Sequence, residues 1–251
     1  MQETNLEYNI IKVDLEDKPI EFIELYSRAN PLPGVRAKVP LLEIIYEDDD
    51  NDDSKVLCES LVVSEYVAEL QAKLVEGSSS ANGSGLLLPS SLEDRAIMRL
   101  FTELCSSCFT YFPILRARDE ASLETALHQF KSGLYNADIF LRTMGSSSSS
   151  IKGQNNGPFL FGNQFTLAEC NAAPFVQRAC MVLPMGIGGG RPISPLDICD
   201  DLGLDRLKLW MEAVIDRPSV KATGLPEEIM MKNMNKMMKK LERMDGEQAK
   251  Q

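Results

Sequence analysis

A change in residue pattern divides this chain into two parts of different fold class. Before the run Gly-Ser-Ser-Ser-Ala-Asn-Gly-Ser-Gly at 77–85, short β-branched stretches alternate with helical stripes, and after it the pattern is helical throughout. A run rich in glycine and serine is typical of a flexible linker. The 251 residues are enough for two modest domains. We therefore predict a domain over 1–76, a linker over 77–90 and an all-helical domain over 91–251.

The first part predicts strands and helices in an α/β arrangement. Residues 8–14 are β-branched and aromatic, with partial alternation, and predict a strand. Residues 18–26 predict a short helix with proline in its first turn. The stretches 39–46 and 55–58 predict two further strands, and 59–74 carries a helical stripe. The expected order is strand, helix, strand, strand, helix.

The second part predicts an all-α bundle. Long amphipathic segments over 92–118 and 121–144 come first. Thr166-Leu-Ala-Glu169 is a capping box, in which each of the two side chains accepts a hydrogen bond from the backbone N–H of the other residue. It predicts a helix that runs from there to about Val182. Another helix is expected over 204–215, before the Arg-Pro pair.

The C-terminal segment predicts a basic amphipathic helix. Methionine and leucine recur at helical spacing, and basic residues occupy the positions between them. The helix has two interpretations: a calmodulin-type or membrane-surface element, or a terminal helix docked on the body of the protein. The apolar positions are Met230, Met231, Met234, Met237, Met238 and Leu241, and the basic ones are Lys232, Lys236, Lys239, Lys240 and Arg243.

Charge and hydropathy exclude several classes of protein. The net charge is −11, which argues against a nucleic-acid partner. Six acids lie in one run, Glu47, Asp48, Asp49, Asp50, Asp52 and Asp53, and predict a solvated loop because the spacing of a calcium-binding EF-hand is missing. No apolar run is long enough for a membrane span, and the first ten residues lack the basic and apolar character of a secretory signal. We expect a cytoplasmic location.

The cysteines predict reduced thiols, not a disulfide framework or a metal site. Cys105 and Cys108 form a C-x-x-C within a helical stretch, which favours core or pocket lining over redox or metal chemistry. With one histidine, His128, and no second cysteine pair, no metal is expected. The six positions are Cys58, Cys105, Cys108, Cys170, Cys180 and Cys199.

The order of elements and several short motifs resemble the glutathione transferase superfamily. The motifs are most similar to those of the omega and lambda classes, whose members typically use a cysteine as the reacting residue. The resemblance spans nearly the whole chain and implies a thioredoxin-like domain followed by a helical bundle. Its motifs are Lys38-Val-Pro-Leu-Leu-Glu43, Val56-Leu-Cys-Glu-Ser-Leu61 with Glu65-Tyr66, Gly157-Pro-Phe-Leu-Phe-Gly162, Phe165-Thr-Leu-Ala-Glu169, Ala173-Pro-Phe175 and Arg217-Pro-Ser-Val-Lys-Ala-Thr223.

This resemblance implies a site for glutathione. Pro40 matches the family's cis-proline, and the Val39 backbone would pair with the extended cysteinyl residue of the ligand. Ser60, at a helix N-terminus, would hold the γ-glutamyl carboxylate, and Glu59 would meet the ammonium of the same group. Lys38 is a weaker candidate for the glycyl carboxylate. The alternative is that Val39-Pro40 is a simple turn and Ser60 a helix cap.

The family's reacting residue has no counterpart among these motifs. Residues 8–14 resemble the family's second strand, and the residues before them are too few for a strand and a helix. We therefore expect a thioredoxin-like domain that lacks its first βα unit, with no catalytic residue assigned. Either the chain is incomplete or the domain has lost catalysis.

A pocket for the second substrate is expected on the first long helix. Cys105, Phe109 and Phe112 are candidates for its apolar wall, with helix–helix core as the alternative. The implied function is glutathione conjugation or glutathione-dependent thiol transfer, with glutathione as co-substrate and a small electrophile or disulfide as its partner. The alternative is a non-catalytic binding or scaffold module. A homodimer is expected by analogy alone.

Overall fold

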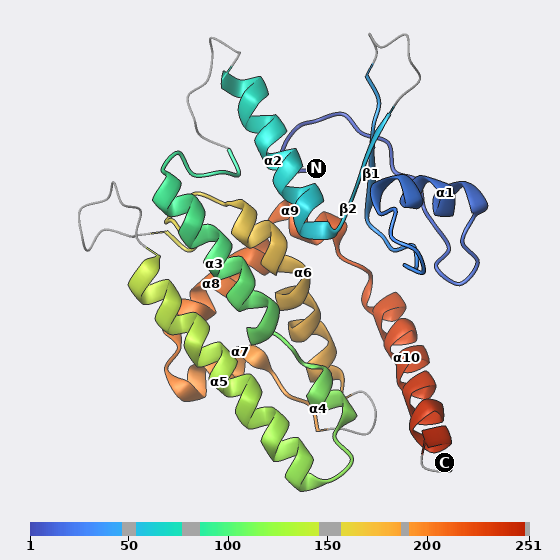
Figure 1. The fold of residues 1–251 in the computed structure, drawn as a ribbon. Helices are drawn as coiled ribbons and strands as arrows, with labels where there is room; N and C mark the ends of the chain where they lie inside the picture. Colours follow the sequence, from blue (N-terminus) through green and yellow to red (C-terminus); the bar gives the residue numbers. More distant parts are fainter. Residues whose placement is uncertain (47–53, 77–85, 146–156, 187–190, 249–251) are drawn as a thin grey trace. The chain divides into compact units, whose positions relative to one another are not determined.

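A computed structural model describes residues 1–46, 54–76, 86–145, 157–186 and 191–248. The chain forms two compact units, Met1–Leu88 and Pro89–Gln251, and this division falls within the predicted linker 77–90. The acidic run 47–53 and the glycine and serine run 77–85 lie outside the described residues. The two units are described separately below (Figure 1).

The first unit carries a two-stranded sheet and two helices. Helix α1 covers Ile20–Ala29, strand β1 Leu41–Ile44, strand β2 Lys55–Cys58 and helix α2 Ser60–Glu76. The predicted helices and the two later strands are therefore confirmed. Pro19 is the N-cap of α1 and so lies just before the first turn in which it was predicted. β1 and β2 run antiparallel.

The predicted strand over 8–14 is wrong, because those residues are extended but belong to no sheet. A strand needs a neighbour to pair its backbone N–H and C=O groups, and strand propensity alone does not provide one. Among the described residues β1 pairs only with β2. Ile10 and Ile11 are consequently 73 % and 85 % exposed.

The core of the first unit is small. Phe22 and Tyr26 lie one turn apart on the same face of α1, with ring centroids 6.5 Å apart, and are buried with Ala37. Val13, Leu41 and Cys58 pack against this group from the extended segment and the two strands, and are only partly buried. The Tyr26 hydroxyl is buried and has no hydrogen-bond partner among the described residues.

The second unit is helical, as predicted, but has more breaks than the periodicity indicated. The expected helix over 92–118 is two helices, because the chain turns at Phe109–Tyr111 before Pro113. Two short helices that begin with a proline, α7 and α9, were not predicted. The elements are α3 Leu92–Cys108, α4 Phe112–Arg116, α5 Glu120–Met144, α6 Leu167–Val182, the 3₁₀ turn η1 Leu183–Met185, α7 Pro195–Leu202, α8 Asp205–Asp216, α9 Pro218–Thr223 and α10 Glu227–Gln248.

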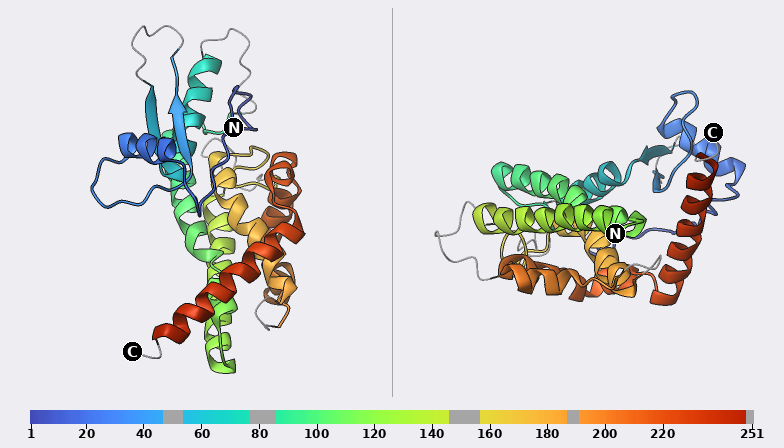
Figure 2. Two further views of the ribbon diagram at one scale, coloured as in Figure 1. Left: turned by 90° about the vertical axis from the view of Figure 1, so that its right-hand side faces the viewer. Right: turned by 90° about the horizontal axis from the view of Figure 1, so that it is seen from below.

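Trp210 on α8 is the centre of the helical core. It is fully buried, with Phe101 edge-on at 5.2 Å and Phe109 stacked at 6.1 Å between ring centroids. Helices α3, α5, α6 and α8 lie side by side around it (Figures 1 and 2). α3 and α5 approach closely at Gly133, where a side chain would meet the Cys108 backbone at 2.9 Å.

The predicted capping box is confirmed and extends into this core. Glu169 is fully buried, and its carboxyl accepts from the Thr166 backbone N–H at 2.8 Å. The same carboxyl accepts from the Leu160 N–H at 2.8 Å and from the Trp210 indole at 3.0 Å. One side chain thus fixes the start of α6, the preceding loop and α8.

None of the described helices has an apolar stretch long enough to cross a lipid bilayer.

Candidate functional site

The pairing of the two strands brings the predicted ligand residues to one corner of the sheet. Leu41, at the start of β1, pairs with Cys58, at the end of β2. Val39-Pro40 lies just before the first of these residues and Glu59-Ser60 just after the second. The two dipeptides therefore meet at the same end of the sheet, where β2 leads directly into α2 (Figure 1).

The Val39–Pro40 peptide bond is cis, as the resemblance implied. Val39 is 48 % exposed, so this residue lies at the surface of the unit. Extended backbone next to a strand can accept a further extended peptide, with main-chain hydrogen bonds providing the affinity. Lys38, immediately before, is also exposed.

Glu59 has a left-handed backbone conformation, with φ of 70°. A residue with a side chain pays about 1–2 kcal/mol for this conformation. Such strain gathers at ligand sites, where the surrounding structure maintains it. Here it produces the abrupt change from strand to helix, because the Glu59 carbonyl already accepts the Val63 N–H at 2.9 Å.

Ser60 is the first residue of α2 and its hydroxyl is exposed. The first N–H groups of any α-helix lack partners within the helix, and the helix dipole makes that end positive. A serine at this position adds a hydroxyl donor to those amides. The corner therefore combines an anion-binding helix end with extended main chain, which are the two chemistries that a modified peptide with a free carboxylate requires.

Comparisons with known proteins agree with this geometry. Residues 1–70 match the family model described as the N-terminal domain of glutathione S-transferase. The chain also resembles the solved structure of glutathione transferase Omega 1C from Trametes versicolor, with a TM-score of 0.62 and 23 % identity over 94 % of this chain and 88 % of that one. It has the fold of a glutathione transferase.

Two further structures share this glutathione transferase fold. The trimeric glutathione transferase of Leishmania gives a TM-score of 0.63 at 19 % identity, over 96 % of this chain and 44 % of that one. A family member from Pseudomonas fluorescens, with two glutathione molecules bound, gives 0.56 at 15 % identity, over 88 % and 83 % of the two chains. No curated protein matches the sequence at a significant level.

The residues predicted for a second-substrate pocket do not gather at one surface of the glutathione transferase fold. Cys105 and Phe109 are 1 % and 0 % exposed in the helical core, where Phe109 stacks on Trp210. Phe112 is 40 % exposed, with its ring 4.8 Å from that of Tyr111. The placement of the first two favours the core alternative, and Phe112 alone offers apolar surface.

The cysteines are buried or partly buried in their own units. Cys58 ends β2, but its side chain packs with the Phe22 and Tyr26 group. Burial raises the pKa of Cys108 to about 11 and that of Cys199 to about 12, and it raises the pKa of Cys105 well above its usual value. Since the thiolate is the nucleophile, these buried thiols are poor reactants. No metal-binding cluster of three His, Cys, Asp or Glu residues occurs among the described residues.

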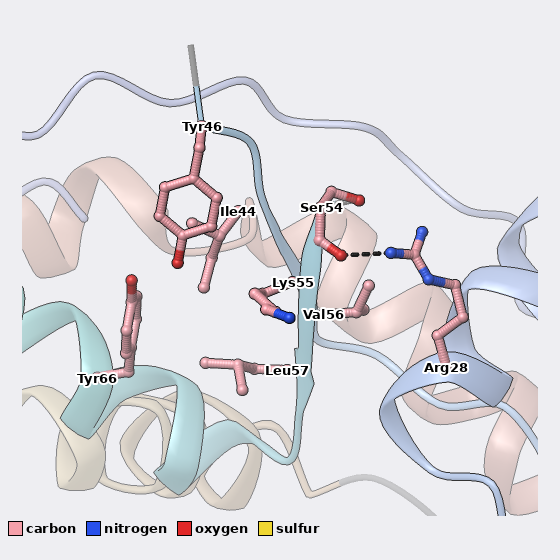
Figure 3. A pocket seen from close by; sticks show the side chains of 8 residues that line it. All are labelled: Arg28, Ile44, Tyr46, Ser54, Lys55, Val56, Leu57 and Tyr66. Carbon is pink, nitrogen blue, oxygen red and sulfur yellow. Dashed lines mark hydrogen bonds between the residues drawn. The ribbon is translucent and has the colours of Figure 1, made fainter. Parts of the chain in front are cut away.

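A cavity of about 440 Å³ lies at the other end of the sheet. The sequence did not predict this cavity. Figure 3 shows the hydroxyls of Tyr46 and Tyr66 directed toward one another beside Ile44 and Leu57. Burial, and then the nearby Tyr46, raise the pKa of Tyr66. Tyr46 follows β1 and Tyr66 lies on α2, 20 residues later, so the fold brings the two side chains together. Arg28 donates to the Ser54 carbonyl at the rim.

Proposed function

We propose that this chain binds glutathione at the corner formed by Val39-Pro40 and Glu59-Ser60. The register of β1 and β2 carries the proposal, because it aligns the end of one strand with the start of the other. The bound glutathione in the Pseudomonas fluorescens structure supports the same ligand class.

Each part of the ligand has a counterpart at the corner. The Val39 main chain pairs with the cysteinyl residue, as an added strand would. The Ser60 hydroxyl and the first amides of α2 hold the γ-glutamyl carboxylate, and the Glu59 carboxylate receives its ammonium. Lys38 is near enough in sequence to neutralise the glycyl carboxylate.

The reaction that this binding would serve is conjugation of glutathione to a small electrophile, or thiol transfer with a disulfide. A non-catalytic glutathione-binding module is the second candidate. The environment of Cys58 favours the second candidate, since this thiol of the first unit packs against the Phe22 and Tyr26 group. A redox or detoxification role, a cytoplasmic location and a homodimer remain predictions.

Binding is tested by retention of the full chain on immobilised glutathione, with elution by free glutathione. Ser60→Ala removes a hydrogen bond to a charged group, so we expect binding to weaken about tenfold or more. Ser64→Ala is the matched control, one turn further along α2, where the hydroxyl donates to the Leu61 carbonyl. A stably folded chain that is not retained would refute the proposal.

Turnover distinguishes the two candidate functions. Conjugation of a chromogenic electrophile and reduction of a glutathione mixed disulfide are measured on the same preparation. Turnover that Ser60→Ala lowers together with binding establishes the transferase. Retention without turnover in either assay establishes the binding module.

A further inference from the structure

Helix α10 presents two chemically different faces. Met230, Met234 and Met238 are 7 %, 6 % and 3 % exposed, so three of the methionines form a buried line along the helix, and α10 contacts α6. This agrees with the docked interpretation of the helix, although Met231 is 39 % exposed. The opposite face carries exposed basic residues, which are Lys232, Lys236, Lys239, Lys240 and Arg243.

These five cations form a single stripe, here called the basic face. At 100° per residue their positions fall within an arc of about 100°, roughly opposite the three buried methionines. The rise of a helix spreads them over about 16 Å. Figures 1 and 2 show α10 as an uninterrupted helix that ends the described chain. A straight row of positive charge therefore stands out on a protein whose net charge is −11.

We propose that the basic face of α10 binds an anionic phospholipid surface. Four of its five cations are lysines. A lysine ammonium is a compact point charge that needs no directional partner, whereas recognition of single phosphates or base edges favours the forked donors of arginine. A row of lysines suits the diffuse negative charge of a lipid leaflet.

An apolar residue within the basic face favours lipid over a soluble polyanion. By helical spacing Ile229 lies in the same arc as the cations, and it is 47 % exposed. Leu225, just before the helix, is 46 % exposed. These side chains gain free energy at a membrane interface and gain none against a nucleic acid or an acidic peptide in water.

The association is peripheral and reversible. Because Met230, Met234 and Met238 are already buried within the protein, α10 does not insert as a free amphipathic helix would. Each lysine near an anionic leaflet changes the partition coefficient by about fivefold, and the effect decays within a Debye length. Binding should therefore fall steeply as salt is added.

The test is co-sedimentation of the full chain with vesicles. We expect no binding to pure phosphatidylcholine and salt-sensitive binding once phosphatidylserine is included. Replacing Lys232, Lys236, Lys239 and Lys240 by Gln should lower the partition coefficient by more than about 100-fold. The control changes four exposed lysines elsewhere, Lys12, Lys55, Lys73 and Lys131, to Gln, with the same change in net charge. It should retain most of the binding.

Three outcomes overturn the proposal. Equal binding to both kinds of vesicle, or equal loss in the two quadruple variants, would show that the basic face has no specific part in it. Binding of soluble poly-glutamate or duplex DNA without binding of the phosphatidylserine vesicles would assign the face to a polyanionic partner instead. Ile229→Ser gives an independent check, because it should weaken vesicle binding and leave poly-glutamate binding unchanged. Circular dichroism verifies that each variant retains its helices.

Discussion

The two units are stabilised in different ways. The helical unit surrounds Trp210 with aromatic rings and saturates its buried Glu169 with donors. The first unit rests on a short sheet and the Phe22 and Tyr26 group, and leaves the Tyr26 hydroxyl buried without a partner among the described residues.

The helical unit is therefore the main source of stability, and the first unit carries the proposed binding site. A large, satisfied core provides most of the free energy of folding, since apolar burial scales with the area removed from water. The smaller unit holds a strained residue, Glu59, and an exposed residue, Val39. Groups held in that way are poor for stability and well suited to meeting a ligand.

The largest predicted contrast is in thiol reactivity. Burial, and then the nearby Asp138 and Asp200 carboxylates, raise the pKa of Cys199 from 9.0 to about 12. The thiolate fraction at neutral pH is then about 1,000-fold lower than for an unfolded cysteine. We expect iodoacetamide to modify Cys199 about 1,000-fold more slowly in the native chain than in urea, and Cys58, half-buried in the first unit, to react sooner. Mass spectrometry of the modified peptides measures both rates.

The raised pKa of Cys199 also makes the free energy of unfolding depend on pH. A thiol whose pKa is raised by folding favours the folded state while it stays neutral. Its contribution is fully present below pH 9.0 and is lost as the pH rises toward about 12. The helical unit should therefore unfold at lower urea concentration as the pH rises through this window. Equal modification rates in native and unfolded chains would contradict the buried environment.

Glu169→Ala should cost the helical unit about 3–5 kcal/mol of unfolding free energy. The substitution leaves the buried N–H groups of Leu160, Thr166 and Trp210 without their acceptor, and each unpaired group costs about 1–3 kcal/mol. Urea unfolding followed by Trp210 fluorescence measures the loss. Glu103→Ala, at an exposed position on α3, is the control and should change stability by less than about 0.5 kcal/mol. Similar losses of unfolding free energy in the two variants would mean that the hydrogen bonds of Glu169 do not stabilise the helical unit specifically.

Glu59→Gly should separate stability from binding within the first unit. Glycine adopts a φ of 70° without steric cost, so the unfolding free energy should stay level or rise by up to about 1 kcal/mol. Glutathione affinity should fall about tenfold, because the carboxylate proposed to meet the ammonium is gone. Calorimetric titration measures the affinity and urea unfolding the stability. A parallel loss of both would mean that Glu59 is only a structural residue.

Tyr26→Phe should have the smallest effect, and in the opposite direction to the change at Glu169. Removing a buried hydroxyl that has no partner relieves a desolvation cost, so stability should be unchanged or higher by about 1 kcal/mol. The midpoint of urea unfolding measures it. A loss above about 1 kcal/mol would show that the hydroxyl is satisfied in solution.

Local interactions explain what could be predicted from the sequence. The start of α6 follows from Thr166 and Glu169, which lie within a single turn. β2 and α2 follow from short-range patterns in the same way. α7 and α9 also carry a local signal, because each has proline at its first helical position, at Pro195 and Pro218.

Features that depend on distant partners could not be predicted. The segment 8–14 has strand composition, but whether it forms a strand depends on a neighbour that local propensity does not supply. Phe109 looked equally suited to a pocket or a core, and only the position of Trp210, 101 residues later, decides its contact. At the candidate site, residue types and order were predictable, while the alignment of the two dipeptides required the register.

That register has a consequence for sequence variation. A ligand that pairs with the Val39 backbone does not read its side chain, which stands 48 % exposed. A saturation scan of glutathione retention should therefore be nearly silent at position 39, although the ligand would touch it, and sensitive at Ser60. Recognition encoded in the main chain leaves little trace in residue identity.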